Sequence, residues 1–368
     1  MLVTHGLTPV QNVQNSQIPW SRTGGFATPP HMGGLATQPH RGGLATPPHR
    51  GGFAAPPQRG GLAITVGNFD GVHRGHGAML ARLKEKSAQL GVPSCLLTFE
   101  PHPREFFTPQ AAPARLTRLA AKLALLRVAG LDRVHVARFN TQFASQPPER
   151  FIEDVIVGGL GCAWLLVGRD FRFGARRAGD FALLEKAALQ HGFELEAMPE
   201  VKNAGERISS SAVRAALEGG DFGRAQALLG RPYSISGRIA HGRRLGRELG
   251  FPTANIRLPQ KSPLAGIFVV EVLGLPERPN KLGLPERPDN AWPAVASVGL
   301  RPTVNDDAVP LLEVHLFDFA GDLYGRRLEV RFLHKLRDEE KYPDLEKLKL
   351  AIALDASNAR EFFAVKTT

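Results

Sequence analysis

Apolar strand patterns and amphipathic helix patterns alternate along the chain from residue 62 to about residue 229. The predicted strands comprise residues 62–66, 94–99, 133–137, 163–168 and 193–198. Helical patterns between them stop at glycines such as Gly91 and Gly130, and Ser145 is a candidate cap for a helix over residues 147–157. This alternation predicts βαβ units, a mostly parallel sheet with helices on both faces, and ligands at the carboxyl ends of the strands.

The turn after the first predicted strand has the most specific sequence in the chain. Residues 67–76 read Gly-Asn-Phe-Asp-Gly-Val-His-Arg-Gly-His, and an amphipathic helix pattern follows. A strand-to-helix turn directs backbone N–H groups and the positive end of the helix dipole at one point, which suits a phosphate group. His73 and His76 project from one face, and Gly75 leaves room for a nucleotide. Taken singly, these residues could form an ordinary turn; their combination favours a nucleotide site.

The pattern changes after residues 230–232, Gly-Arg-Pro, to short strands separated by turns. These strands comprise residues 233–240, 267–273, 294–298, 312–317 and 328–333. Such spacing predicts a small antiparallel barrel. Pro343 opens a helix whose apolar stripe, which includes Leu348 and Ile352, could cover one side of the barrel. The sequence therefore predicts two folded domains, over residues 61–225 and 231–365.

Two tandem repeats interrupt these patterns. Residues 1–60 contain nine-residue repeats that begin with Gly-Gly-Phe-Ala or Gly-Gly-Leu-Ala. Because this segment has much glycine and proline and few large apolar side chains, we expect it to be disordered. A second duplication, with Leu-Gly-Leu-Pro-Glu-Arg-Pro in both copies, lies within residues 273–290 and predicts an enlarged loop between strands.

The net charge of +11 is compatible with nucleic acid, a membrane surface or anionic small ligands. Residues 1–60 hold four arginines and no lysine or acidic residue, and acids and bases alternate in the remainder. No dedicated nucleic-acid surface is therefore expected. No run approaches the roughly 18 apolar residues of a membrane span. Cys95 and Cys162 are too few for a disulfide framework, which favours a reducing, cytoplasmic location.

Three further motifs follow strand ends or helix starts in the first predicted domain. Residues 98–107 read Thr-Phe-Glu-Pro-His-Pro-Arg-Glu-Phe-Phe. Aromatic rings that could stack on a flat ligand flank a stiff loop in this segment. The alternative is that these rings are simply part of the hydrophobic core. Residues 168–177 interleave aromatics with four arginines, which also fits a solvated loop or a single-stranded nucleic-acid site. Residues 207–214 read Arg-Ile-Ser-Ser-Ser-Ala-Val-Arg. One serine suffices as a helix cap, whereas three beside two arginines favour a triphosphate site.

The second predicted domain carries two sets of oxygen-bearing side chains. Thr253 and Asn255 are two apart along an extended chain, so a hydroxyl and an amide oxygen could face one Mg²⁺ together; the alternative is a simple turn after proline. Glu313 alternates with Leu312 and Val314 and therefore faces away from one layer of core. A surface carboxylate is the usual interpretation of such a residue.

Together these motifs resemble those of the prokaryotic bifunctional riboflavin kinase/FAD synthetases. The four motifs of the first domain resemble the adenylyltransferase half of that family. In the second domain, residues 246–255, Gly-Arg-Glu-Leu-Gly-Phe-Pro-Thr-Ala-Asn, look like its kinase signature, and residues 313–319 resemble its catalytic strand. The resemblance covers about residues 61–363. It implies a Rossmann-like nucleotidyltransferase domain followed by a small antiparallel β-barrel flavokinase domain with a C-terminal helix.

The resemblance also implies two reactions. The second domain would transfer the γ-phosphoryl group of ATP to riboflavin to give FMN, with Glu313 as general base and with Thr253 and Asn255 as ligands of Mg²⁺. Its ATP and magnesium site would also include Gly246, Arg247, Gly250 and Pro252. The first domain would then join FMN to the adenylyl group of a second ATP, giving FAD and pyrophosphate.

For the adenylyl transfer the resemblance assigns three sets of residues. The catalytic residues would be His73, His76 and Arg207. The flavin would be bound by His102 and Phe107. The ATP site would comprise Gly67, Phe69, Asp70, Gly71, Gly75, Asp170, Ser209, Ser210, Ser211 and Arg214. The third hydroxyl of the serine motif is Ser211, where the family commonly has threonine.

Three other functions remain open at this point. The first is an adenylyltransferase for another acceptor, which would leave the second domain unexplained. The second is a catalytically dead flavin or nucleotide-binding regulator, and the third is a basic nucleic-acid binder with steep salt dependence. For the flavin enzyme we expect ATP, riboflavin and FMN as small-molecule partners, no nucleic-acid or membrane partner, and a monomer.

Overall fold

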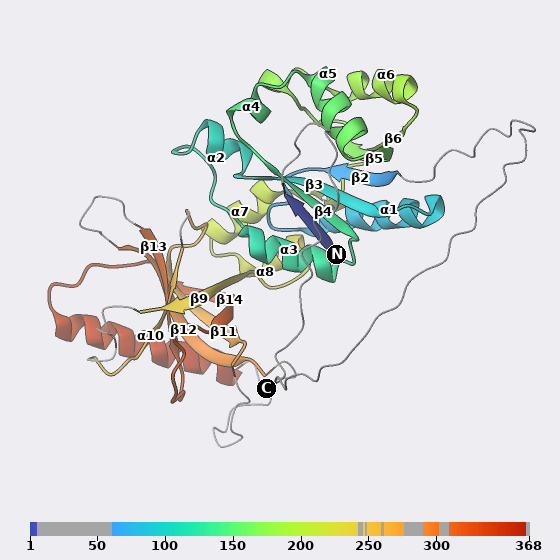
Figure 1. The fold of residues 1–368 in the computed structure, drawn as a ribbon. Helices are drawn as coiled ribbons and strands as arrows, with labels where there is room; N and C mark the ends of the chain where they lie inside the picture. Colours follow the sequence, from blue (N-terminus) through green and yellow to red (C-terminus); the bar gives the residue numbers. More distant parts are fainter. Residues whose placement is uncertain are drawn as a thin grey trace, which may run out of the picture.

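The computed structural model describes residues 1–5, 61–241, 246, 249–258, 261–275, 290–301 and 309–365. Within these ranges the chain forms a parallel sheet with helices and, beside it, a closed barrel flanked by a long helix (Figure 1). Most of the repeats of residues 1–60 and of 273–290 lie outside the described residues, as does Arg247.

The first domain is built on a six-stranded parallel sheet with the strand order β1-β4-β3-β2-β5-β6. Its strands are β1 (Leu2–His5), β2 (Leu62–Val66), β3 (Ser94–Glu100), β4 (Arg133–Arg138), β5 (Cys162–Gly168) and β6 (Glu194–Met198). All five residues of β2 are buried, as expected for a central parallel strand covered on both faces. The five strands predicted from the sequence are all present.

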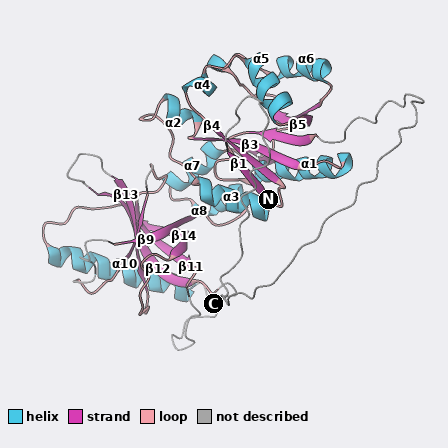
Figure 2. Cartoon of the chain, in the orientation of Figure 1, coloured by secondary structure: helices cyan, strands magenta, loops and turns pink. Residues whose placement is uncertain are grey.

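Helices cover both faces of this sheet (Figure 2). The larger ones are α1 (Arg74–Leu90), α3 (Leu119–Val128), α6 (Phe181–His191) and the π-helical segment η1 (Phe151–Gly159). Leu80 and Leu126 pack with Ala63 on one face, whereas Ile156 and Leu184 pack around Ile64 on the other. The parallel sheet with helices on both faces is therefore confirmed.

One predicted helix start is wrong. Ser145 ends the short helix α4 (Thr141–Ala144), whose cap is Asn140. The next helix begins with Pro148 in α5 (Pro148–Arg150) and continues into η1. Proline at the first helical position needs no hydroxyl cap, because its missing N–H is one of the unpaired donors of a helix start.

A second correction concerns the N-terminus. The expectation of disorder over residues 1–60 is wrong for Leu2–His5, which pairs in parallel with β4 in the register Leu2–Arg133 to His5–Val136. The hydroxyl of Thr4 lies 2.7 Å from Nδ1 of His135, and Val3 packs against the core of that face. Strand β1 therefore forms the edge of the sheet next to β4.

The second domain is a closed antiparallel barrel with the strand order β10-β13-β12-β11-β14-β9. Its strands are β9 (Ser234–Ala240), β10 (Ala254–Arg257), β11 (Gly266–Leu273), β12 (Trp292–Arg301), β13 (Val309–Leu316) and β14 (Arg327–Arg337). The barrel is confirmed, and β10 is a strand that the sequence analysis did not predict. Helix α10 (Leu345–Val365) lies along the outside, where Ala359 and Phe363 pack on Val269 and Phe317.

Two helices join the sheet to the barrel. Helices α7 (Ser210–Glu218) and α8 (Phe222–Leu229) share one hydrophobic core with the barrel interior. The ring of Phe222 lies 5.8 Å from that of Phe268 and 6.3 Å from that of Phe332. Helix α8 thus includes the predicted limit at residue 225 and ends just before that at residue 231, and those limits stay predictions.

The remaining short elements shape the carboxyl edge of the sheet. They are α2 (Pro103–Phe107), η2 (Ala175–Arg177), β7 (Lys202–Asn203) and β8 (Glu206–Arg207). All the motifs quoted above for the first domain lie on or next to these elements and the turn before α1.

Candidate active sites

Three stacked rings form the centre of the first site. The ring of His76 lies between those of Phe69 and His73, with centroid distances of 4.4 Å and 3.6 Å. Space is tight at two glycines of this turn, because a Cβ at Gly67 would come 3.1 Å from the Phe69 ring and a Cβ at Gly75 would come 3.1 Å from Nδ1 of His73. The glycines of this turn therefore make room for the ring stack as well as for a ligand.

Both imidazoles are neutral at physiological pH. Burial lowers the pKa of His73 to about 4 and lowers the pKa of His76 well below its ordinary value. Nδ1 of His73 accepts the backbone N–H of His76 at 3.2 Å, so it caps α1 and carries no proton there. A neutral imidazole that accepts at Nδ1 has its remaining proton on Nε2, as a hydrogen-bond donor.

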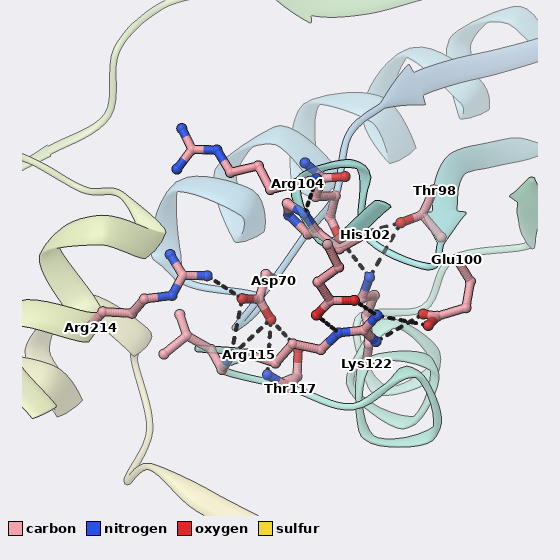
Figure 3. Close-up of polar contacts among 12 residues, drawn as sticks. Asp70, Thr98, Glu100, His102, Arg104, Arg115, Thr117, Lys122 and Arg214 are labelled. Atoms are coloured by element: carbon pink, nitrogen blue, oxygen red, sulfur yellow. Dashed lines mark hydrogen bonds and ion pairs between the residues drawn. The ribbon is translucent and has the colours of Figure 1, made fainter. Parts of the chain in front are cut away.

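The side chain of Asp70 holds the turn before α1 in place. Its buried carboxylate accepts hydrogen bonds from the backbone N–H groups of Leu116 at 3.1 Å and of Thr117 at 2.9 Å (Figure 3). The guanidinium of Arg214, from α7, forms an ion pair with the same carboxylate. The carboxylate is thus occupied by protein donors, and its role in the site is to hold Arg214 and the turn in place.

A second group of polar residues closes over this turn from the other side. The hydroxyl of Ser210 donates to the backbone carbonyl of Asp70 at 2.8 Å, and Ser209 caps α7 by accepting the N–H of Ala212 at 3.1 Å. His76, Ser210, Ser211 and Arg214 line one cleft of about 330 Å³. The structure therefore brings the paired imidazoles and the serine-rich helix start together, as a common nucleotide site requires.

A larger aromatic cleft opens on the far side of His76. It has a volume of about 1170 Å³ and is lined by Phe99, Phe107, Phe139, Phe143, Phe151, Phe171 and Phe173. The ring of Phe139 lies within 6 Å of those of Phe99, Phe107 and Phe143. The side chain of Phe107 is 61% exposed, so it is not core, in contrast to the plainer interpretation of its motif. Such a wall suits a flat aromatic ligand.

The two clefts share part of their lining. His76, Asn68, Pro103, Arg104 and Arg177 contribute to both. Arg104 and Arg177 were not singled out from the sequence, although each stands in a quoted motif. Two ligands bound side by side would meet at these residues.

Some predicted residues lie apart from this junction. Arg207 forms ion pairs with Asp170 at 2.7 Å and Glu200 at 3.3 Å, and it lines neither cleft. Asp170 lines the aromatic cleft.

His102 accepts the N–H of Arg104 at 3.1 Å and lines the smaller cleft, whereas Phe107 lines the aromatic one. Gly71 has φ +84° and a Cβ there would come 2.8 Å from Leu116, so its place is structural.

The second site lies on the outer face of the barrel, beneath α10. Asn255 on β10 pairs directly with Glu313 on β13, so their side chains point to the same face. Thr253, Asn255 and Glu313 line one cleft of about 550 Å³ together with residues of α10 such as Ile352. The alternation of buried Leu312 and Val314 with Glu313 has the predicted form.

Asn255 passes one test for a metal ligand. It is buried, its Nδ2 donates to the carbonyl of Thr253 at 3.3 Å, and its Oδ1 has no hydrogen-bond partner among the described residues. A buried amide oxygen without a donor is costly unless a ligand satisfies it. A hard cation that prefers oxygen ligands fits this atom together with the Thr253 hydroxyl.

The loop before β10 frames this cleft. Gly246 lines it, and a Cβ there would come 2.5 Å from the carbonyl of Phe251. Pro252 lines the adjoining cleft of about 360 Å³, which also reaches Thr253 and Asn255. Gly250 has φ +89°, a conformation that favours glycine. His315, which the sequence analysis did not single out, has Nδ1 3.0 Å from the carbonyl of Pro252, which accepts its proton.

Comparison with known proteins agrees with this two-site geometry. The FAD synthetase family model matches residues 55–212, and the riboflavin kinase model matches residues 229–363. The bifunctional riboflavin kinase/FMN adenylyltransferase of Pseudomonas fluorescens is 49% identical over 301 residues, which are 82% of this chain and 92% of that protein. The enzyme of Escherichia coli K12 is 47% identical over 303 residues, 82% and 93% of the two chains. The chain belongs to the bifunctional riboflavin kinase/FMN adenylyltransferase family.

Membership of this family explains why two separate sites occur on one chain. The FAD synthetase model covers the residues of β2 to β6, and the riboflavin kinase model covers the barrel and most of α10. The crystal structure of a macrolide-efflux protein from Streptococcus pneumoniae has a similar fold, with a TM-score of 0.64 and 26% identity over 82% of this chain and 94% of its own. In the described ranges, every helix is too short or too polar to cross a membrane.

Proposed function

We propose that this bifunctional enzyme makes FMN and then FAD from Mg²⁺-bound ATP, with the residues described above in defined roles. The observation that carries the adenylyl-transfer part is that His76 lines both the nucleotide-sized cleft and the aromatic cleft. FMN in the aromatic cleft and ATP in the smaller one would then place the FMN phosphate next to the α-phosphate of ATP. The flavin ring of FMN accounts for the seven phenylalanines of the aromatic cleft, so no other class of adenylyl acceptor needs to be assumed.

In the adenylyl transfer, an oxygen of the FMN phosphate attacks the α-phosphorus of ATP, and pyrophosphate leaves. The nucleophile is already anionic at neutral pH, so the site needs to stabilise charge more than to remove a proton. Neutral His76, the hydroxyl of Ser211 and the guanidinium of Arg214 supply donors around one cleft, which Ser210 also lines although its proton goes to the carbonyl of Asp70. Asp70 and Ser209 hold these donors in position, and Arg207 acts from the rim through Asp170.

In the kinase reaction, the 5′-hydroxyl of riboflavin attacks the γ-phosphorus of ATP, its proton passes to Glu313, and ADP leaves. Thr253 and Asn255 would hold Mg²⁺, which neutralises charge on the phosphates when it is bound. Asn255 pairs with Glu313 on the neighbouring strand, which supports a base and phosphates on one face of the barrel. Gly246, Gly250 and Pro252 shape the loop around the nucleotide, and Arg247 belongs to the same motif outside the described residues.

Two substitutions test both assignments in one assay. The purified protein is incubated with ATP, Mg²⁺ and either riboflavin or FMN, and the products are separated by chromatography. We expect Glu313→Gln to abolish FMN formation but to leave FAD formation from supplied FMN, and His76→Ala to do the reverse. If either substitution abolished both reactions in folded protein, the two-site assignment would be wrong. A cytoplasmic, monomeric state without nucleic-acid or membrane partners remains a proposal based on the sequence.

A further inference from the structure

We infer that Arg231, at the entry to the barrel, is a positioning residue for the adenylyl-transfer site. This inference rests on the proposed function of the His73/His76 turn and adds to it a residue from outside that turn. Arg231 follows Gly230, the left-handed residue that ends α8, and precedes the first barrel strand β9. Arg231 lines neither of the two adenylyl-transfer clefts, so it would act through the residues that it holds.

The guanidinium of Arg231 reaches across to the nucleotide turn and donates to two consecutive carbonyls. Nη2 donates to the carbonyl of Gly71 at 2.6 Å, and Nη1 donates to that of Val72 at 3.0 Å. Nη1 also lies 3.4 Å from the carbonyl of Leu229, at the end of its own helix. One planar side chain thus connects the last helix of the first domain to the residues directly before His73.

One of the two residues that Arg231 holds, Val72, is in an unfavourable backbone conformation. Val72 has φ +41° and Gly71 has φ +84°, and two positions earlier Phe69 has φ +49°. A β-branched residue rarely adopts a positive φ, so the turn requires outside contacts to persist. The N–H of Val72 donates to the carbonyl of Phe69 at 3.3 Å within the turn. From outside, Thr117 accepts the N–H of Gly71 at 3.0 Å, and Arg231 binds the carbonyls of Gly71 and Val72.

The geometry of the ring stack depends on that turn. His73, the next residue, has the extended conformation of a helix cap and accepts the N–H of His76, while its carbonyl accepts the N–H of Gly77 at 2.9 Å. If Val72 relaxed to a negative φ, the direction of His73 would change and the His76 ring would lose the neighbour that fixes it. A change in the position of a group that takes part in the reaction lowers the rate of the chemical step strongly. Binding of the substrates changes little.

Arg118 provides a matched control. It is also an arginine that joins the two domains through a single side chain, because its Nη2 donates to the backbone carbonyl of Arg257 on β10. Within the described residues, the side chain of Arg118 forms no hydrogen bond with the nucleotide turn. Arg118→Ala therefore removes a connection between the domains without releasing the carbonyls of Gly71 and Val72.

The test compares Arg231→Ala, Arg231→Lys and Arg118→Ala in the full chain. FAD formation from FMN and FMN formation from riboflavin are measured on the same preparations, with melting temperatures. We expect Arg231→Ala to lower kcat for FAD formation about 10- to 100-fold with KM values within about threefold, and to leave FMN formation unchanged. Arg231→Lys should recover part of kcat, because an ammonium group can reach one carbonyl at a time. Arg118→Ala should match the unsubstituted protein.

Backbone hydrogen exchange provides a readout that does not depend on activity. The N–H groups of His76 and Gly77 should exchange faster in Arg231→Ala than in Arg118→Ala, because their acceptors belong to His73. The inference is overturned if Arg231→Ala retains full kcat for FAD formation, or if Arg118→Ala causes the same loss of kcat. If Arg231→Ala does not fold, full kcat in folded Arg231→Lys overturns the inference instead. Absence of FAD formation by the unsubstituted protein would instead contradict the proposed function.

Discussion

Nδ1 of His73 accepts the backbone N–H of His76 at 3.2 Å while the two imidazole rings stack at a centroid distance of 3.6 Å. The first ring therefore acts as a helix cap and as a wall for the second. Protonation of His73 would remove the acceptor and place a positive charge against a buried neutral ring, so the arrangement depends on both rings staying neutral.

This relationship predicts how stability changes with pH. His73 has a pKa of about 4 in the folded protein against 6.5 ordinarily, so the unfolded chain binds more protons between these values. The free energy of unfolding should be at its full value above pH 6.5 and should decrease towards pH 4, by roughly 3 kcal/mol for this residue. Denaturant titrations at several pH values measure the slope.

His73→Asn separates the titration from the cap. Asparagine is a good helix cap and does not titrate, so the variant should lose less stability between pH 6.5 and pH 4 than the unsubstituted protein. Part of the slope should remain, because burial also lowers the pKa of His76 well below its ordinary value and that of His135 to about 4. His191→Asn, in the last turn of α6, is the control. An unchanged slope in His73→Asn would contradict the prediction.

Asp70→Asn should destabilise the protein strongly. The substitution leaves the guanidinium of Arg214 without its charge partner in a site where both side chains are almost buried. Breaking such a pair costs roughly 3–5 kcal/mol. We expect a loss of this size in the free energy of unfolding. Glu206→Gln, which breaks the exposed pair with Arg224, should cost at most about 1 kcal/mol. Similar losses in the two variants would show that Asp70 is not an anchor.

Asn255→Leu should weaken the magnesium dependence of FMN formation. The substitution removes the unpaired Oδ1 from the cleft while keeping a side chain of similar shape. The Mg²⁺ concentration for half-maximal FMN formation should rise about 10-fold or more, because hard cations need oxygen ligands. FAD formation from FMN by the same preparation should stay unchanged. An unaltered Mg²⁺ titration would remove Asn255 from the metal site.

Phe107→Ala should weaken FMN binding with little effect on stability. The ring is 61% exposed at the mouth of the aromatic cleft, so its removal leaves no cavity in the core. Loss of one stacking contact of about 0.5–1.5 kcal/mol corresponds to a KM for FMN raised roughly 2- to 10-fold. Leu189→Ala, on α6 and 89% exposed, is the control. A KM within error of the control would exclude Phe107 from the flavin site.

Features encoded in local sequence could be predicted. The alternation of strands and helices follows from periodic burial, and Ser209 caps its helix through a bond to the residue three positions later. The nucleotide turn was recognisable because its glycines, histidines and flanking strand are adjacent in sequence. The same holds for the alternation around Glu313.

Features that depend on pairing between distant segments could not be predicted. Strand β1 has only four residues and is defined by β4, more than a hundred residues later. Strand β10 is equally short and follows a proline, so the sequence indicated only an extended segment, with a turn as the alternative. The aromatic cleft combines phenylalanines from separate elements, and the anchoring role of Asp70 depends on Arg214. No local periodicity contains these relationships.

The edge position of β1 has a consequence for how this gene can vary. The strand pairs with β4, yet the chain between it and β2 includes the whole tandem repeat. Closing a longer connection costs only about 0.6 kcal/mol for each doubling of its length. A change in the number of nine-residue copies therefore lengthens or shortens this connection and leaves the described pairing of β1 with β4 as it is.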